Sequence, residues 1–127
     1  MFKGIFKYGI LVIGITMLAV FPAFAADQTD VVITRAISSV EKNRPVSVYI
    51  DDVRIGTLMP GRSLETRVKN GNHIIVAKIT PNKNKEIISD LFFTADDTKT
   101  LQFRIHIEEE GALLLKKTVI FITELED

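Results

Sequence analysis

The sequence predicts an all-β protein: a single antiparallel β-sandwich of seven or eight strands, transthyretin- or immunoglobulin-like in outline, after an N-terminal signal peptide. After Ala25, the β-branched residues Val, Ile and Thr supply 32 of 102 residues, whereas Ala and Leu supply 13. Branching at Cβ favours strands over helices. Apolar and polar residues alternate from Thr100 to Ile107, which is the period of a strand with one buried face. Turn-forming residues recur at intervals of about 8–12 residues, as in sandwiches and barrels.

The first residues of the chain have the pattern of a secretory signal peptide. Lys3 and Lys7 make the start positively charged, and Ile10–Val20 is an apolar run without a charge. The triplet Ala23-Phe24-Ala25 follows, and small residues at its first and third positions are typical of a signal-peptidase site. This order predicts an exported protein.

The expected boundaries are 1–25 for the signal peptide and 26–127 for one β-sandwich domain. The protein is then periplasmic or extracellular, and it touches the membrane transiently through the signal peptide only. The alternative is an uncleaved membrane anchor, because Tyr8–Ala26 is 19 residues long without a charge, about the length that crosses a bilayer.

Turn residues divide the domain into eight expected strands. They lie near residues 31–37, 46–50, 53–58, 63–68, 73–80, 86–93, 99–107 and 113–123. The breaks are Asp51-Asp52, Pro60-Gly61-Arg62, Lys69-Asn70-Gly71-Asn72, Pro81 to Lys85, Asp96-Asp97 and Glu108 to Gly111. Asn70-Gly71 predicts a tight hairpin, because both residues tolerate positive φ. Residues 38–45 are expected to be a loop or one helical turn.

Alternation also predicts which side chains form the core. Two inward-facing sets are expected: Val46, Val48 and Ile50, and then Ile75, Ala77 and Ile79. The segment from Leu113 to Ile122 is apolar on both faces. Because a small protein that exposes such a surface often binds a partner with it, this segment is a candidate interaction edge.

Composition excludes several classes of function. The chain has 16 basic and 16 acidic residues, and this zero net charge argues against nucleic acid as a partner. It has no Cys, which excludes disulfides, thiolate metal sites and a cysteine nucleophile. We expect no cofactor.

The residues that could carry catalysis or hold a metal are few. The two histidines, His73 and His106, could ligate a metal with Asp90 or Glu108, but they lie on different expected strands and lack the spacing of a metal motif. No serine stands in a Gly-x-Ser-x-Gly context, and the paired acids fall at expected turns. The sequence therefore predicts a non-enzyme without a metal.

A basic cluster is the candidate binding surface. Arg67, Lys69, Lys78, Lys83 and Lys85 surround one expected hairpin and the loop after it, a pattern that suits an anionic polysaccharide, a lipid headgroup or phosphate. The absence of Trp weakens carbohydrate recognition, because sugars stack on aromatic rings. The candidate binding residues are Tyr49, Arg67, Lys69, His73 and Lys78.

Residues 46–79, VSVYIDDVRIGTLMPGRSLETRVKNGNHIIVAKI, contain a strand, a turn at Asp51-Asp52, a second strand with Gly56, and a Gly71-x-His73 strand. This order resembles the PEGA-like domains of bacterial and archaeal envelope proteins. It departs from them in two respects. Asp-Asp stands where Asp-Gly is usual, and the sequence that names the family is not present, with Met59-Pro60-Gly61 standing nearby. The resemblance implies a small β-sandwich outside the cytoplasm that serves as an accessory or binding module without shared catalytic residues.

The expected function is that of an exported, non-catalytic, envelope-associated module that binds another protein or a cell-surface polymer. Strand addition along Leu113 to Ile122 is one route to such binding. The alternative is a carrier of a small apolar ligand, with a β-barrel cavity between the strands. An enzyme would require His73 and His106 to meet a carboxylate in a cleft.

Overall fold

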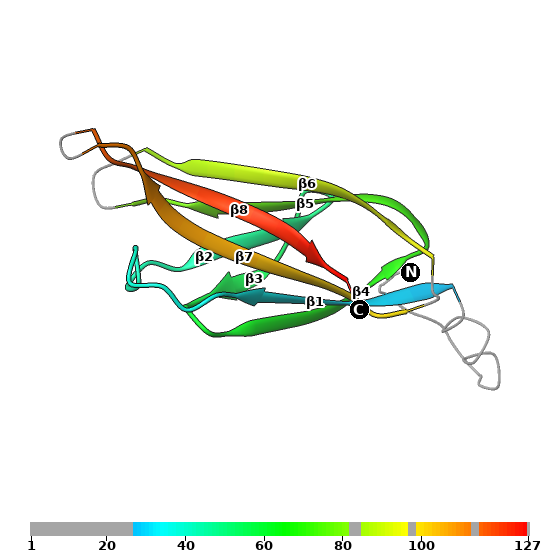
Figure 1. The fold of residues 1–127 in the computed structure, drawn as a ribbon. Helices are drawn as coiled ribbons and strands as arrows, with labels where there is room; N and C mark the ends of the chain where they lie inside the picture. Colours follow the sequence, from blue (N-terminus) through cyan, green and yellow to red (C-terminus); the bar gives the residue numbers. More distant parts are fainter. Residues whose placement is uncertain (1–26, 82–84, 97–98, 113–114, 127) are drawn as a thin grey trace.

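The computed structural model describes residues 27–81, 85–96, 99–112 and 115–126, and it forms eight strands and no helix within them (Figure 1). The strands are β1 (Gln28–Arg35), β2 (Val46–Ile50), β3 (Val53–Leu58), β4 (Ser63–Lys69), β5 (Gly71–Ile79), β6 (Ile87–Ala95), β7 (Leu101–Glu110) and β8 (Lys117–Leu125). The all-β prediction is confirmed. The expected signal peptide, residues 1–25, lies outside the described residues.

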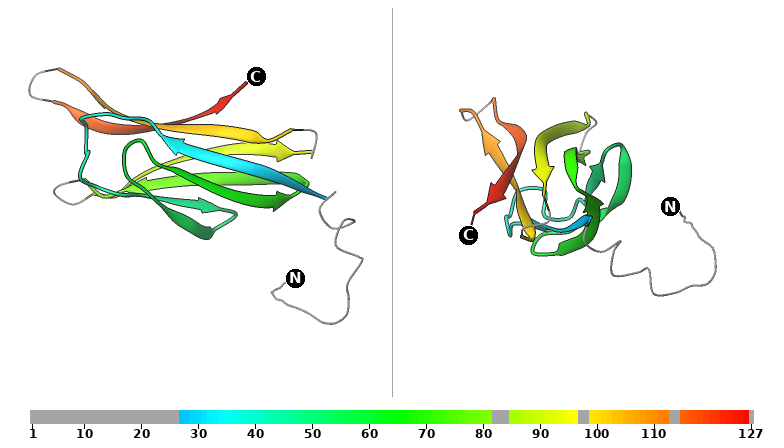
Figure 2. Two further views of the ribbon diagram at one scale, coloured as in Figure 1. Left: turned by 90° about the horizontal axis from the view of Figure 1, so that it is seen from below. Right: turned by 90° about the vertical axis from the view of Figure 1, so that its right-hand side faces the viewer.

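The strands form two four-stranded sheets that face each other (Figure 2). One sheet, here called the first sheet, has the order β4-β1-β7-β8, and the second sheet has the order β3-β2-β5-β6. Both sheets twist, and β6 at the edge of one comes close to β8 at the edge of the other. The described residues contain no ladder between these two edges.

The expectation of a purely antiparallel arrangement is wrong at one pair. β1 runs parallel to β7, with Val31 opposite Leu101 and Arg35 opposite Ile105. A tight turn can only join antiparallel neighbours, but β1 and β7 are separated along the chain by five other strands, β2 to β6. The long connection leaves their relative direction free.

The expected hairpin at Asn70-Gly71 is also absent. β4 pairs with β1 and β5 pairs with β2 and β6, so Asn70 and Gly71 carry the chain from the first sheet to the second. The Asn70 side-chain oxygen instead accepts a hydrogen bond from the Thr29 hydroxyl at 2.9 Å, and the Asn70 N–H donates to the Asp27 carbonyl. These bonds fix the crossing to the start of β1.

The break expected from Glu108 to Gly111 begins too early. The three glutamates continue β7 and pair with the first residues of β8, with Glu110 opposite Lys117. Glu108, Glu109 and Glu110 are exposed at this end of the β7–β8 pair, so their carboxylates stay hydrated there. The first strand likewise lies earlier than expected, since β1 ends at Arg35 and residues 36–45 form a loop.

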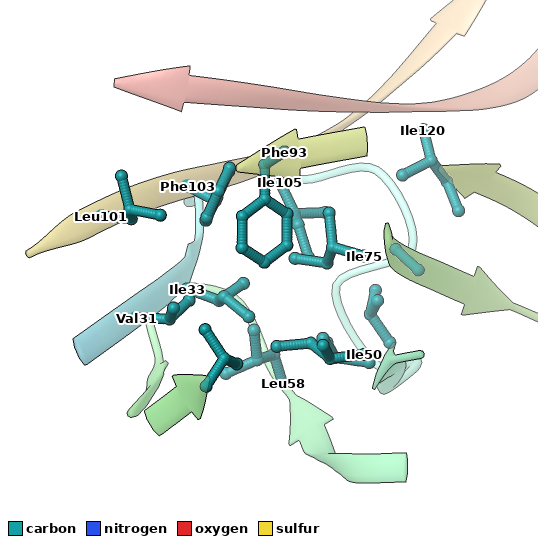
Figure 3. Close-up of a cluster of buried hydrophobic side chains, with 14 of the residues drawn as sticks. Val31, Ile33, Ile50, Leu58, Ile75, Phe93, Leu101, Phe103, Ile105 and Ile120 are labelled. Atoms are coloured by element: carbon teal, nitrogen blue, oxygen red, sulfur yellow. The ribbon is translucent and has the colours of Figure 1, made fainter. Parts of the chain in front are cut away.

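The core fills the space between the sheets (Figure 3). The inward sets predicted from alternation are confirmed: Val46, Val48, Ile50, Ile75, Ala77 and Ile79 are all buried. The first sheet contributes alternate residues of β1 and β7, and Phe103 from β7 meets Phe93 from β6 with ring centroids 4.9 Å apart. Among the described residues, no helix has the length and apolar character that crossing a bilayer requires.

Candidate functional site

The Asp51-Asp52 turn joins β2 to β3 at one end of the molecule. Asp51, His73 and the main-chain carbonyl of Lys69 form a polar cluster there, here called the His73 cluster. Both residues have positive φ, 50° and 69°, as the two central positions of a tight hairpin turn require. The Asp51 side chain accepts a hydrogen bond from the Ile74 N–H at 3.0 Å, and the Asp51 N–H donates to the Ile74 carbonyl at 3.0 Å. The turn is thereby fastened to β5.

His73 lies on β5 beside this turn, and both of its ring nitrogens are within hydrogen-bond distance of a partner. Nδ1 lies 2.5 Å from Asp51 Oδ2, and Nε2 lies 2.6 Å from the main-chain carbonyl of Lys69. A carboxylate and a carbonyl only accept hydrogen bonds, so the ring satisfies both when it is doubly protonated. The Phe93 ring lies beside it, with the ring centroids 5.5 Å apart and the planes tilted by 30°.

The surroundings shift the pKa of both partners. Burial alone lowers the pKa of His73, but the hydrogen bonds to Asp51 and to the Lys69 carbonyl and the charge of Asp51 together outweigh burial, and the pKa is raised above 6.5. Burial alone raises the pKa of Asp51, but the bonds from His73 and the Ile74 N–H and the charge of His73 hold it below 3.8. Both shifts favour the charged forms, so His73 and Asp51 stabilise each other as an ion pair whenever the ring is protonated.

This geometry gives His73 a structural role. A general base or metal ligand needs a ring nitrogen that is free to face a substrate or an ion, and both nitrogens are occupied. His106 lies on β7 in the first sheet, opposite Phe121 of β8, so the two histidines do not meet. The described residues contain no group of three or more His, Asp or Glu side chains that could hold a metal ion.

The basic candidates are distributed over different surfaces. Arg67 on β4 forms an ion pair with Asp30 on β1 at 2.8 Å, on the first sheet. Lys69 enters the His73 cluster through its carbonyl, whereas Lys78 lies on β5 in the second sheet. Lys83 lies outside the described residues. The residues were expected around one hairpin, and because β4 and β5 belong to different sheets they do not share a face.

The outer face of the second sheet brings Tyr49 and Lys78 together. Lys78 Nζ lies 4.7 Å from the centroid of the Tyr49 ring, a cation–π contact. Two further apolar side chains project from β6 on this face, and Phe92 is 76% exposed and Ile88 is 54% exposed. Sequence reasoning missed Phe92, although alternation along β6 places it opposite in direction to the buried Phe93.

The first sheet ends at β8, which has a second exposed aromatic. β8 pairs with β7 alone within the described residues, and Phe121 is 41% exposed while its neighbour Ile120 is buried. The two-faced apolar character predicted for this segment is thus present, with Ile120 serving the core and Phe121 facing outward. An edge strand also carries main-chain groups with no partner in its own sheet.

The most buried charged side chain among the described residues is Arg35, which the sequence reasoning did not select. Its guanidinium donates to the carbonyls of Arg44 at 2.6 Å, Leu58 at 3.0 Å and Glu41 at 2.9 Å, and the residue is 1% exposed. Alternation carried the signal, because Arg35 has the same parity as the buried Val31. Burial lowers the pKa of Arg35, and the charge of Glu41 opposes this shift.

The chain was compared with protein families, curated proteins and solved structures. None of them matches it. Three features of the fold bear on its function: the occupied His73 cluster, the outer face of the second sheet and the β8 edge.

Proposed function

We propose that the protein is an exported, non-catalytic, envelope-associated β-sandwich, PEGA-like and of the transthyretin or immunoglobulin type, that binds another protein along β8. The segment bound there adds as an extended strand to the first sheet. Such strand addition obtains affinity from main-chain hydrogen bonds and specificity from side chains that alternate along the edge.

The observation that carries this proposal is the position of β8 at a sheet edge with Phe121 exposed beside it. Aromatic side chains, Phe among them, are enriched in protein interfaces. Export is supported by the charge and apolar pattern of residues 1–25, which predicts a signal peptide.

The interior supports a binding module over the alternative of a small-ligand carrier. Side chains of both sheets meet between them, and Phe93, Phe103 and Ile105 occupy the middle of this space (Figure 3). A carrier needs a cavity of about 300 Å³ or more. The occupied ring nitrogens of His73 support a role outside catalysis.

Photo-crosslinking in the native cell envelope tests the proposal. A photoreactive phenylalanine analogue replaces Phe121 in the full chain, and a control variant carries it at Thr57, which is exposed on β3 at the edge of the second sheet. We expect one protein to be captured at position 121 and not at position 57, and we expect Phe121→Asp to abolish its binding. Equal capture at both positions, or recovery of polysaccharide alone, would contradict strand addition at β8.

A further inference from the structure

The outer face of the second sheet carries a row of four residues, one from each strand. In register, Arg54 on β3 lies opposite Tyr49 on β2, Tyr49 opposite Val76 on β5, and Val76 opposite Asp90 on β6. The row therefore has a positive charge at one edge of the sheet, a negative charge at the other, and an aromatic and an aliphatic residue between them. Arg54 and Asp90 are both exposed.

The surroundings of this row are apolar. Ile74 and Phe92 form the next pair along β5 and β6, and Ile88 lies on the other side, opposite Lys78. Phe92 is exposed by 76%, which leaves most of an aromatic ring in water. Lys78 is held over Tyr49 by the cation–π contact, so its stem adds to the apolar surface.

The two charges of the row cannot reach each other within one molecule. Strands of a sheet are about 4.8 Å apart, so three steps separate Arg54 from Asp90 by about 14 Å. The arrangement is instead complementary to itself. A two-fold axis that lies between β2 and β5, parallel to the strands and in the plane of contact, places Arg54 of one copy over Asp90 of the other, and Tyr49 over Val76.

We propose that a second copy of this chain covers the outer face of the second sheet, in a two-fold dimer with Arg54 of each copy paired with Asp90 of the other. Sheets pack face to face with their strands within about 30° of each other, which this axis permits. The symmetric pairing satisfies both charges of each copy, and Phe92 and Tyr49 lose exposed surface to it. The edge strand β8 belongs to the other sheet and contributes no residue to this row.

The test is a pair of charge reversals in the protein produced from the full 127-residue sequence. Sedimentation velocity from about 1 µM to about 300 µM covers the affinities of a transient dimer. We expect the wild type to dimerise in this range. Arg54→Glu alone and Asp90→Arg alone should each weaken dimerisation by about tenfold or more, since each places like charges opposite each other at two positions.

Mixing the two variants is the decisive measurement. In a mixed dimer, the glutamate introduced at position 54 of one copy meets the arginine introduced at position 90 of the other, and the native Arg54 meets the native Asp90. We therefore expect an equimolar mixture to dimerise about as well as the wild type. Arg104→Glu, an exposed reversal on β7 in the first sheet, is the matched control and should change nothing. Circular dichroism of each variant checks that the fold is retained.

Several results would overturn the dimer. One is a wild type that stays monomeric throughout this range, another is a mixture that stays as monomeric as its components, and a third is equal weakening by Arg104→Glu. The proposed binding along β8 is independent of these outcomes. A monomeric protein that is still crosslinked at Phe121 would refute the dimer alone, and a dimer without capture at Phe121 would refute strand addition alone.

Discussion

Replacement of Arg35 by Met should destabilise the protein more than any exposed substitution. The guanidinium lies at the end of β1 and donates to the carbonyls of Glu41 and Arg44 in the 36–45 loop and of Leu58 at the end of β3. It therefore connects the first sheet to the second and holds the 36–45 loop against the end of both sheets. Met matches the Arg side chain as far as Nε, lacks the rest of the guanidinium and donates no hydrogen bond.

The expected loss follows from the bonds that disappear. Hydrogen bonds from a charged donor contribute about 1.5–3 kcal/mol each, and at the lower end of this range the loss of three of them costs about 4.5 kcal/mol. The three acceptors are main-chain carbonyls, so they remain in the variant and have lost this donor. Burial of the apolar Met side chain returns about 1.5 kcal/mol. The free energy of unfolding should fall by about 3 kcal/mol, a large part of the roughly 5–15 kcal/mol of a typical domain.

Urea unfolding followed by circular dichroism measures this loss. With a slope of about 1.5 kcal/mol per molar, the midpoint should fall by about 2 M. Arg67→Met is the matched control, because it removes an ion pair whose two side chains are both 56% exposed, and such surface pairs contribute about 0.2–1 kcal/mol. If Arg35→Met unfolds within about 1 kcal/mol of the wild type, the three bonds do not stabilise the loop and the reasoning is refuted.

Three further predictions concern the turns and the His73 cluster. Stability should decline as pH rises above 6.5. The pKa of His73 is raised in the folded protein, so its stabilising contribution is complete below 6.5 and is lost as pH rises through the pKa of the folded state. At the acid end, the pKa of Asp51 is lowered, so its contribution is present above 3.8 and is lost as pH falls through that lowered pKa. Urea titrations at several pH values should show the upper decline in the wild type and not in His73→Gln. Asp52→Gly should raise the free energy of unfolding by about 0.5–1 kcal/mol by relieving positive φ, whereas Asp51→Gly should lower the melting temperature because the Ile74 and His73 bonds are lost. Gly61→Ala should lower the free energy of unfolding, measured by urea titration, by about 1 kcal/mol. The reason is that Gly61 has φ 80° in the Pro60-Gly61 turn, a conformation that alanine adopts only with strain.

Local sequence patterns were sufficient for the strands and for most of the core. The alternation along β2, β5 and β7 predicts which residues are buried, because side chains of a strand point to opposite faces regardless of its neighbours. The Asp51-Asp52 turn was predictable for a similar reason, since Asp is among the few residues that tolerate positive φ. Both features depend on residues that are adjacent in the chain.

Pairing between distant strands was not predictable in this way. Nothing in residues 28–35 or 101–110 specifies that β1 and β7 lie side by side and parallel, because the pairing depends on how the intervening strands pack. The same limit explains the basic candidates. Asn70-Gly71 has the composition of a hairpin turn, but β4 and β5 pair with strands of different sheets, so the chain crosses between the sheets there. This crossing places Arg67 and Lys78 in different sheets.

Two polar contacts connect the sheets, one at Arg35 and the other at His73, and neither involves Phe121, Arg54 or Asp90. Arg35 on the first sheet donates to Leu58 of the second, and His73 on the second sheet contacts Lys69 of the first. The register of β1 with β4 places Arg35 and Lys69 at opposite ends of the molecule, so each end is closed by one basic side chain that crosses between the sheets. These two contacts and the core between the sheets hold the sheets together. Phe121 and Asp90 are exposed and take part in neither contact, so we expect a loss of binding on changing them to report on an interface, with circular dichroism as the check on folding.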